Sequence, residues 1–177
     1  GFSQGAGLKI FGGWGSRGYP QKSFALFARR RYGDGKIQYP VFPNESVTEF
    51  EALVLRNSGN DNQSTHQTPA RPPITEFGST AAYGSYFVNG NFTLMRDAMM
   101  QRLLRGTGLD TQAYRPAVLY LNGHYWGIYN IREKMNEHYL TSHHDLDTGE
   151  LDLIEGYGAV RGGDARVYND MRALIGG

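Results

Sequence analysis

The sequence has no cysteine among its 177 residues. Disulfide bridges and thiolate-bound zinc sites are therefore excluded, and the absence of cysteine suits an exported bacterial protein. Long apolar runs are also missing, because no stretch approaches the roughly 20 residues that a membrane-spanning helix needs. No signal peptide is visible, and the sequence predicts no membrane span.

An excess of charge of one sign is missing too. The 18 Lys and Arg residues and the 17 Asp and Glu residues give a formal net charge of +1. The run Arg29–Arg31 is interpreted as a solvated strand end. Proteins that bind nucleic acid usually carry a basic patch or stripe, so we expect no nucleic-acid partner.

Glycine and tyrosine are plentiful, with 24 and 12 residues. Aromatic strands separated by glycine-rich turns are typical of antiparallel or mixed sheets. Strands are predicted at 7–11, 21–31, 50–57, 115–121, 124–131 and 151–154, and helices at 92–104, 132–140 and 165–174. This order predicts an α+β fold, an antiparallel or mixed β-sheet with helices packed on one face.

Two stretches stand out along the chain. Asn122-Gly123 lies between two alternating apolar runs, which predicts a hairpin with a type I′ turn. From residue 58 to residue 92 the periodicity disappears and Asn, Ser, Thr, Gly and Pro dominate, which predicts a long loop or insertion. The length of the chain fits a single domain over residues 1–177.

A glycine-rich segment at residues 13–18 matches the pattern G-x-G-x-x-G. It lies between two predicted strands, which argues against a dinucleotide-binding turn. It resembles the loop with which kinases cover phosphates, and a plain glycine-rich hairpin loop is the alternative interpretation. Lys22 follows at the start of the next strand and either contacts an anion or is solvated. Glu133 lies at the end of the hairpin, where it either pairs with Lys22 or complements a helix dipole.

A second polar cluster ends the strand at residues 50–57. Arg56, Asn57 and Asp61 belong to it, and a phosphate site, a metal site or a structural turn would explain these residue types. Arg96 and Asp97 open the predicted helix and could pair with this cluster. The histidines and aspartates of residues 138–147 lack metal-site spacing and are interpreted as a solvated loop. No G-x-S-x-G nucleophile motif is present.

Several segments together resemble CotH-like domains, the family of spore coat protein CotH and the CotH kinases. They follow the order of the family over essentially the whole chain, and the most diagnostic is the stretch from Tyr120 to Glu133. The segments are residues 10–17, 20–24, 28–33, 53–61, 96–98, 120–133, 152–154 and 163–164.

The resemblance implies a distantly protein-kinase-like fold that uses ATP and divalent metal (Mg) to phosphorylate secreted proteins. The cofactor-binding residues it implies are Gly13, Gly15, Ser16, Arg17, Lys22 and Glu133, with Glu133 orienting Lys22. The metal-binding aspartates of the family lie in a later Asp-x-Asp block, and nothing after Asp164 matches that block. We therefore expect this chain to be the nucleotide-binding half of the domain, with no catalytic or metal-binding residue of its own and no kinase activity alone.

The sequence is compatible with three functions. The first is a part of an atypical secreted protein kinase, whose protein substrate the sequence does not identify. The second is a non-catalytic module on a bacterial cell surface that binds protein or glycan, for which Trp14, Tyr19, Tyr125 and Trp126 would supply stacking surfaces. The third is a purely structural extracellular domain. Self-association through an exposed apolar face is also expected.

Overall fold

The computed structural model describes residues 1–13, 21–61, 93–156 and 158–176. The chain divides into two compact units, residues 1–133 and residues 134–177. The described residues form antiparallel sheets and α-helices, which confirms the predicted α+β class. Most of the predicted insertion at residues 58–92 lies outside the described residues, and the single-domain boundaries stay a prediction.

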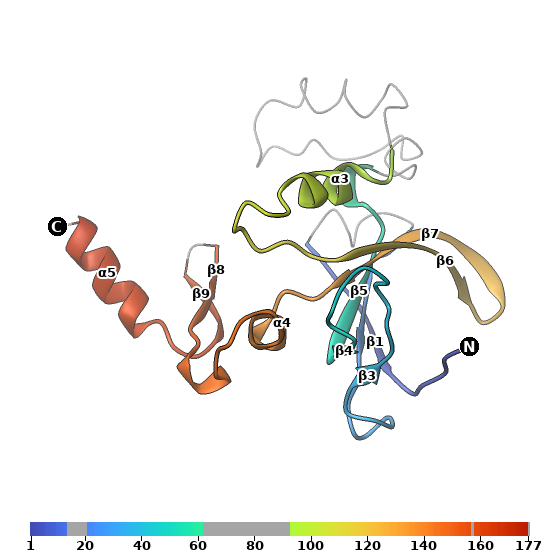
Figure 1. The fold of residues 1–177 in the computed structure, drawn as a ribbon, viewed down its shortest axis with the longest axis horizontal. Helices are drawn as coiled ribbons and strands as arrows, with labels where there is room; N and C mark the ends of the chain where they lie inside the picture. Colours follow the sequence, from blue (N-terminus) through green and yellow to red (C-terminus); the bar gives the residue numbers. More distant parts are fainter. Residues whose placement is uncertain (14–20, 62–92, 157, 177) are drawn as a thin grey trace. The chain divides into compact units, whose positions relative to one another are not determined.

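The first unit is built on a five-stranded antiparallel sheet with the strand order β1-β2-β5-β7-β6 (Figure 1). A separate two-stranded ladder is formed by β3 and β4. The described elements of this unit are β1 (Gly7–Ile10), β2 (Phe24–Phe27), β3 (Ile37–Gln38), β4 (Glu49–Phe50), β5 (Ala52–Arg56), the 3-10 turn η1 (Gly59–Asp61), α3 (Arg96–Leu103), β6 (Tyr114–Leu121) and β7 (His124–Glu133).

Strand β5 lies at the centre of the five-stranded sheet, and it is buried from Ala52 to Leu55. Strand β2 lies between β1 and β5. Residues directly opposite one another in an antiparallel pair project to the same face. Phe24, Leu55 and Ile131 are opposite one another, so they share one face of the sheet, and this face carries the core.

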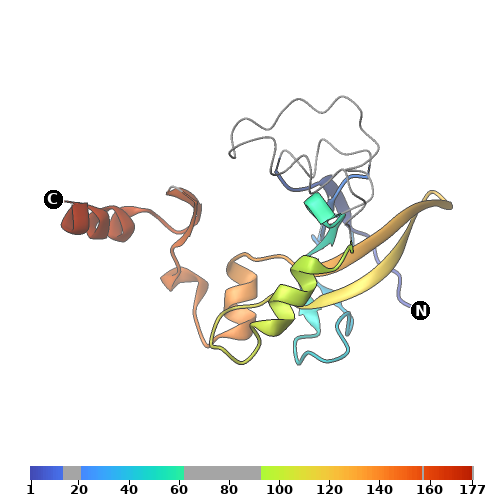
Figure 2. The ribbon, with the colours of Figure 1, turned by 90° about the horizontal axis from the view of Figure 1, so that it is seen from above.

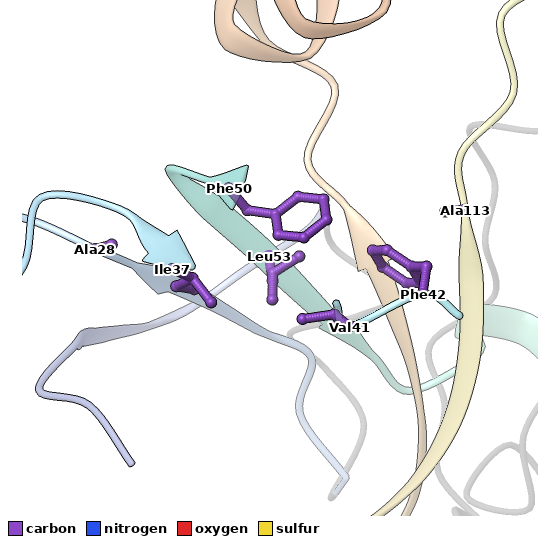
Figure 3. Close-up of a cluster of buried hydrophobic side chains, with 7 residues drawn as sticks. All are labelled: Ala28, Ile37, Val41, Phe42, Phe50, Leu53 and Ala113. Carbon is purple, nitrogen blue, oxygen red and sulfur yellow. The ribbon is translucent and has the colours of Figure 1, made fainter. Parts of the chain in front are cut away.

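Two apolar clusters cover the core face. In the first, Phe42 and Phe50 pack with Leu53 of β5, and their rings meet edge to face with centroids 5.5 Å apart (Figure 3). The second joins Phe24 and Leu55 to Tyr129 of β7. Each large apolar side chain that is fully buried contributes about 1.5–3 kcal/mol, so the first cluster holds the β3–β4 segment against the sheet.

The β6–β7 hairpin forms where the sequence predicts it. Asn122 and Gly123 have φ values of 51° and 80°, as a type I′ turn requires. The register shifts between Leu119 and Tyr120, opposite Gly127, whose φ is 135°. Glycine is favoured at such a bulge because side chains rarely adopt a positive φ.

The two predicted helices around the hairpin begin later than the sequence indicates. Helix α3 starts at Arg96 rather than near Phe92, and Met95 rather than Thr93 is its N-cap residue. The predicted helix at residues 132–140 is wrong at its start, because β7 continues to pair with β5 as far as Glu133. The helix begins instead at Glu137, where the Asn136 side chain accepts a hydrogen bond from the Tyr139 N–H.

The second unit contains little buried apolar surface. Tyr139 is its buried apolar residue among those described, and Val167, Met171 and Leu174 of α5 are exposed. The sequence does not predict β9, the second strand of its small ladder. The described elements are α4 (Glu137–His143), the 3-10 turn η4 (Thr148–Glu150), β8 (Leu153–Glu155), β9 (Ala159–Gly162) and α5 (Arg166–Gly176).

No helix in the described part of the chain is long and apolar enough to cross a membrane. Self-association stays a prediction, and the exposed apolar side chains of α5 are compatible with it.

Candidate functional site

Two ion pairs join the end of β5 and the following turn η1 to the start of α3. Arg56 Nη1 lies 3.3 Å from Asp97 Oδ2, and Arg96 Nε lies 3.4 Å from Asp61 Oδ1. Figure 1 and Figure 2 show α3 beside β5 and β7. The predicted pairing of Arg96 and Asp97 with the polar cluster after β5 is therefore confirmed.

Asp61 holds the beginning of α3 in place. Its Oδ1 accepts a hydrogen bond from Thr93 N at 2.7 Å, and its Oδ2 accepts from Thr93 Oγ1 at 2.8 Å and from Arg96 N at 3.1 Å. Backbone N–H groups at a helix start need acceptors, and a carboxylate there also complements the helix dipole. Asp61 thus supplies the cap that Met95 cannot.

Asn57 is fully buried and is hydrogen-bonded throughout. Its Oδ1 accepts from Ser23 Oγ at 2.8 Å and from Gly59 N at 2.9 Å, and its Nδ2 donates to the Gln21 carbonyl at 2.6 Å. The side chain thereby fixes the chain on both sides of the β2–β5 pair. These hydrogen bonds favour a structural role for Asn57 over direct contact with phosphate.

Ser58 extends the same network to β7 and to the segment before α3. Its φ is 68°, an uncommon backbone conformation for serine. The Ser58 hydroxyl donates to the Leu94 carbonyl at 2.9 Å and accepts from Asn130 Nδ2 at 2.6 Å. Asn130 also donates to the Leu94 carbonyl at 2.8 Å. The approach to α3 is therefore fastened to two strands of the sheet.

Asp97 is shared by two arginines, because Arg132 of β7 also forms an ion pair with its Oδ2. The Arg132 side chain is only 1% exposed, and its Nε and Nη1 have no hydrogen-bond partner in the described part of the chain. Its guanidinium lies 5.8 Å from the centre of the Tyr114 ring. Burial lowers the pKa of Arg132, and the negative charge of Asp97 opposes that change.

The cluster carries a surplus of positive charge. Among the described residues, three arginines and two aspartates form its ion pairs, so the positive charges exceed the negative ones by one. Arginine guanidinium groups bind phosphate and carboxylate oxygens well. Arg56, whose side chain is partly exposed, can therefore hold an anion, whereas the unused donors of Arg132 are buried.

The structure does not bring Lys22 and Glu133 together. Phe24 of β2 and Ile131 of β7 are level with each other, with Leu55 of β5 between them. Lys22 lies two residues before Phe24, and Glu133 lies two residues after Ile131. Because β2 and β7 run in the same direction, these two offsets add up to four residues. Four residues of strand span about 13 Å. Glu133 is buried, and its Oε2 accepts a hydrogen bond from the Ala113 N–H at 2.9 Å.

The strands on both sides of the glycine-rich segment pair as predicted. Strand β1 pairs antiparallel with β2, and Phe11 N donates to the Ser23 carbonyl at 2.9 Å. The Tyr129 hydroxyl donates to the Lys22 carbonyl at 2.6 Å, which fixes the chain where it leaves the segment. Gly13 is exposed, and the predicted Gly15, Ser16 and Arg17 lie outside the described residues.

Asp61 and Asp97 do not fit a divalent cation, because both are ion-paired with arginines. Groups of three or more potential metal-binding side chains are absent from the described residues. Sequence reasoning missed Arg132. Arg132 lies two residues after Asn130, so the two polar side chains project from the same face of the strand. Such a pattern is as typical of a solvated face as of a buried polar site.

The chain was compared with known families and proteins. A family model described as CotH kinase protein matches residues 89–169, a little under half of the chain. These residues are CotH-like. The CotH-like segment runs from the approach to α3 into α5 and contains Arg96, Asp97 and Arg132. Comparison with curated proteins and with solved structures gives no match.

The CotH-like segment confirms the resemblance seen in the sequence, including its most diagnostic stretch at residues 120–133. The earlier segments, with Lys22, Arg56 and Asp61, precede the matched residues. Their likeness to the family stays a prediction.

Proposed function

We propose that this chain is the nucleotide-binding part of a phosphotransferase that transfers phosphate from ATP to a protein. The similarity to the CotH kinase family indicates a kinase-related protein. Secretion, a location at a bacterial surface and the use of ATP with Mg are carried over from that family as proposals. The phosphates would bind near the end of β5, where the surplus positive charge lies.

The Arg56–Asp97 ion pair carries this proposal. In protein kinases a lysine on the third strand of the sheet pairs with an acidic residue of the following helix, and the pair positions the nucleotide phosphates. Here β5 is the third strand of the five-stranded sheet in chain order, and α3 is the next described α-helix. Arg56 and Asp97 thus take the role that the sequence suggested for Lys22 and Glu133.

Each residue has a defined part in the proposal. Arg56 presents guanidinium N–H groups to phosphate oxygens, and Asp97 holds that guanidinium in place. Lys22 adds positive charge where the chain leaves the glycine-rich segment. Mg that arrives with the nucleotide would supply charge neutralisation at the phosphates, and we expect none of the described residues to hold it.

The carboxylates of this site are held by arginines, so residues 1–177 are expected to bind nucleotide without transferring phosphate by themselves.

Calorimetric titration of ATP with magnesium tests the proposal. The chain should bind, and Arg56→Ala should weaken binding about tenfold or more, the change expected from losing one charged hydrogen bond. Arg56→Lys should keep part of the affinity, and Lys22→Ala should reduce it. Arg161→Ala is the matched control, because Arg161 forms an exposed ion pair with Glu155 in the second unit.

Two results would overturn the proposal. One is that the native chain binds no ATP at millimolar concentration. The other is that Arg56→Ala binds as well as the native chain while circular dichroism shows that both are folded.

A glycan-binding module is the second candidate, and one observation favours it. Tyr120 and Tyr125 near the hairpin tip are 60% and 61% exposed, and Trp126 is exposed beside them. Exposed aromatic rings offer flat apolar surfaces for stacking. Titration with soluble oligosaccharides separates the candidates, since Tyr125→Ala would abolish glycan binding and leave ATP binding unchanged.

A further inference from the structure

A pocket of about 260 Å³ lies between α3 and the segment that joins β3 to β4. Met95 and Met99 line it from α3, Phe42 and Pro43 line it from the joining segment, and Tyr114 lines it from β6. Met95 and Met99 are 53% and 49% exposed, so this face of the helix is open to solvent. The pocket therefore offers an accessible apolar surface.

The size of the pocket limits what can fill it. Pockets that enclose whole small-molecule ligands usually measure about 300–1,000 Å³, and this one is smaller. It fits one large apolar side chain better than a whole cofactor. Methionine side chains are flexible and polarisable, and they recur on surfaces that accept aromatic or aliphatic groups of partner peptides.

The charged residues around the pocket indicate which charge a partner should carry. Glu45 and Arg105 both line it and form an ion pair with each other. Arg102 also lines it, and no carboxylate among the described residues lies in ion-pair contact with it. The rim therefore carries one unbalanced positive charge, which favours an acidic partner.

We infer that this pocket is a docking site for an acidic peptide that inserts an aromatic side chain between α3 and the β3–β4 segment. The aromatic ring packs against Met95 and Met99, and a carboxylate beside it binds Arg102. The site lies on a different face of α3 from Asp97, whose side chain contacts Arg56 and Arg132. It does not depend on the proposed nucleotide site.

Methyl NMR of the whole chain with ¹³C-labelled methionine tests the inference. The sequence has five methionines, and Met100, Met135 and Met171, which do not line the pocket, serve as internal controls. The probe is a capped pentapeptide with a central phenylalanine flanked by glutamates. Its addition should shift the Met95 and Met99 signals and leave the other three in place.

Two further peptides and two variants define the chemistry. Replacing the phenylalanine by alanine, or the glutamates by lysines, should remove the shifts. Arg102→Glu should weaken binding of the acidic peptide about tenfold or more and leave the ATP titration unchanged. Arg166→Glu, an exposed arginine of α5, is the matched control and should bind like the native chain.

Three outcomes would overturn the inference. The first is that Met95 and Met99 do not respond at millimolar peptide. The second is that the acidic and the basic peptides shift them equally. The third is that they shift when the chain alone is concentrated, which would identify a second copy of the chain as the occupant.

Discussion

Tyr129 is a buried phenol whose titration can be measured. Its side chain is fully buried, and burial raises its pKa to about 12. The unfolded value is about 10, so the folded state keeps the proton at a pH where the unfolded state has lost it. The resulting stability is complete below pH 10 and is lost as the pH rises towards 12.

Denaturant unfolding at pH 9 and pH 11 checks this expectation. The native chain should lose about 1 kcal/mol more between these pH values than Tyr129→Phe, which cannot ionise there. An equal loss in both proteins would show that Tyr129 titrates normally.

Replacing Asp97 and replacing Arg132 should lower the free energy of unfolding by very different amounts. Asp97→Ala leaves the buried Arg132 guanidinium without its carboxylate, and such a change typically costs about 3–5 kcal/mol. Arg132→Met removes the buried charge and leaves Asp97 paired with Arg56. We therefore expect it to change the free energy of unfolding by about 1 kcal/mol or less.

Chemical denaturation of both variants and of their double variant measures these costs. The double variant should recover most of the stability that Asp97→Ala loses. If Arg132→Met costs as much as Asp97→Ala, the buried ion pair is a net source of stability and the expectation is wrong.

Among the elements, the β6–β7 hairpin depends most directly on its turn. Gly123 has a φ of 80° and open space around the position of a Cβ atom, so alanine there is strained by the backbone alone. Gly123→Ala should cost about 1 kcal/mol in thermal or denaturant unfolding. Gly35→Ala is the control, since Gly35 lacks a positive φ and its Cβ would contact Arg30 at 3.4 Å. Equal costs would contradict the expectation.

Elements fixed by local signals could be predicted, and those fixed by distant partners could not. Asn122-Gly123 and the alternation around it determine the hairpin within a few residues, so its position was predictable. The end of β7 depends on pairing with β5, and the start of α3 depends on Asp61, which is remote in sequence. The periodicity of the sequence gives no sign of either the β5–β7 pairing or the contact between Asp61 and α3.

The candidate site shows the same limit. The polar cluster after β5 and its pairing with Arg96 and Asp97 followed from residue types and position. The hypothesis that Glu133 orients Lys22 rested on likeness to kinases, and the register that separates these residues is set by the order of strands. Burial of Arg132 likewise depends on α3 lying over β7.

At the scale of the whole molecule, the two units should differ in local stability. Strand β5 is buried and paired on both sides, whereas the described residues of the second unit bury one apolar side chain, Tyr139. Hydrogen exchange followed by mass spectrometry should show β8 and β9 exchanging well before β5 and β7. Similar rates in the two units would contradict this expectation.

The sharing of Asp97 has a consequence for how an anion would be received. An anion that binds Arg56 meets a guanidinium that Asp97 already orients, and the same carboxylate forms a second ion pair with Arg132. The anion would add a negative partner to Arg56 without displacing Asp97. Anion, Arg56, Asp97 and Arg132 would then form a chain of alternating charges that joins β5, α3 and β7.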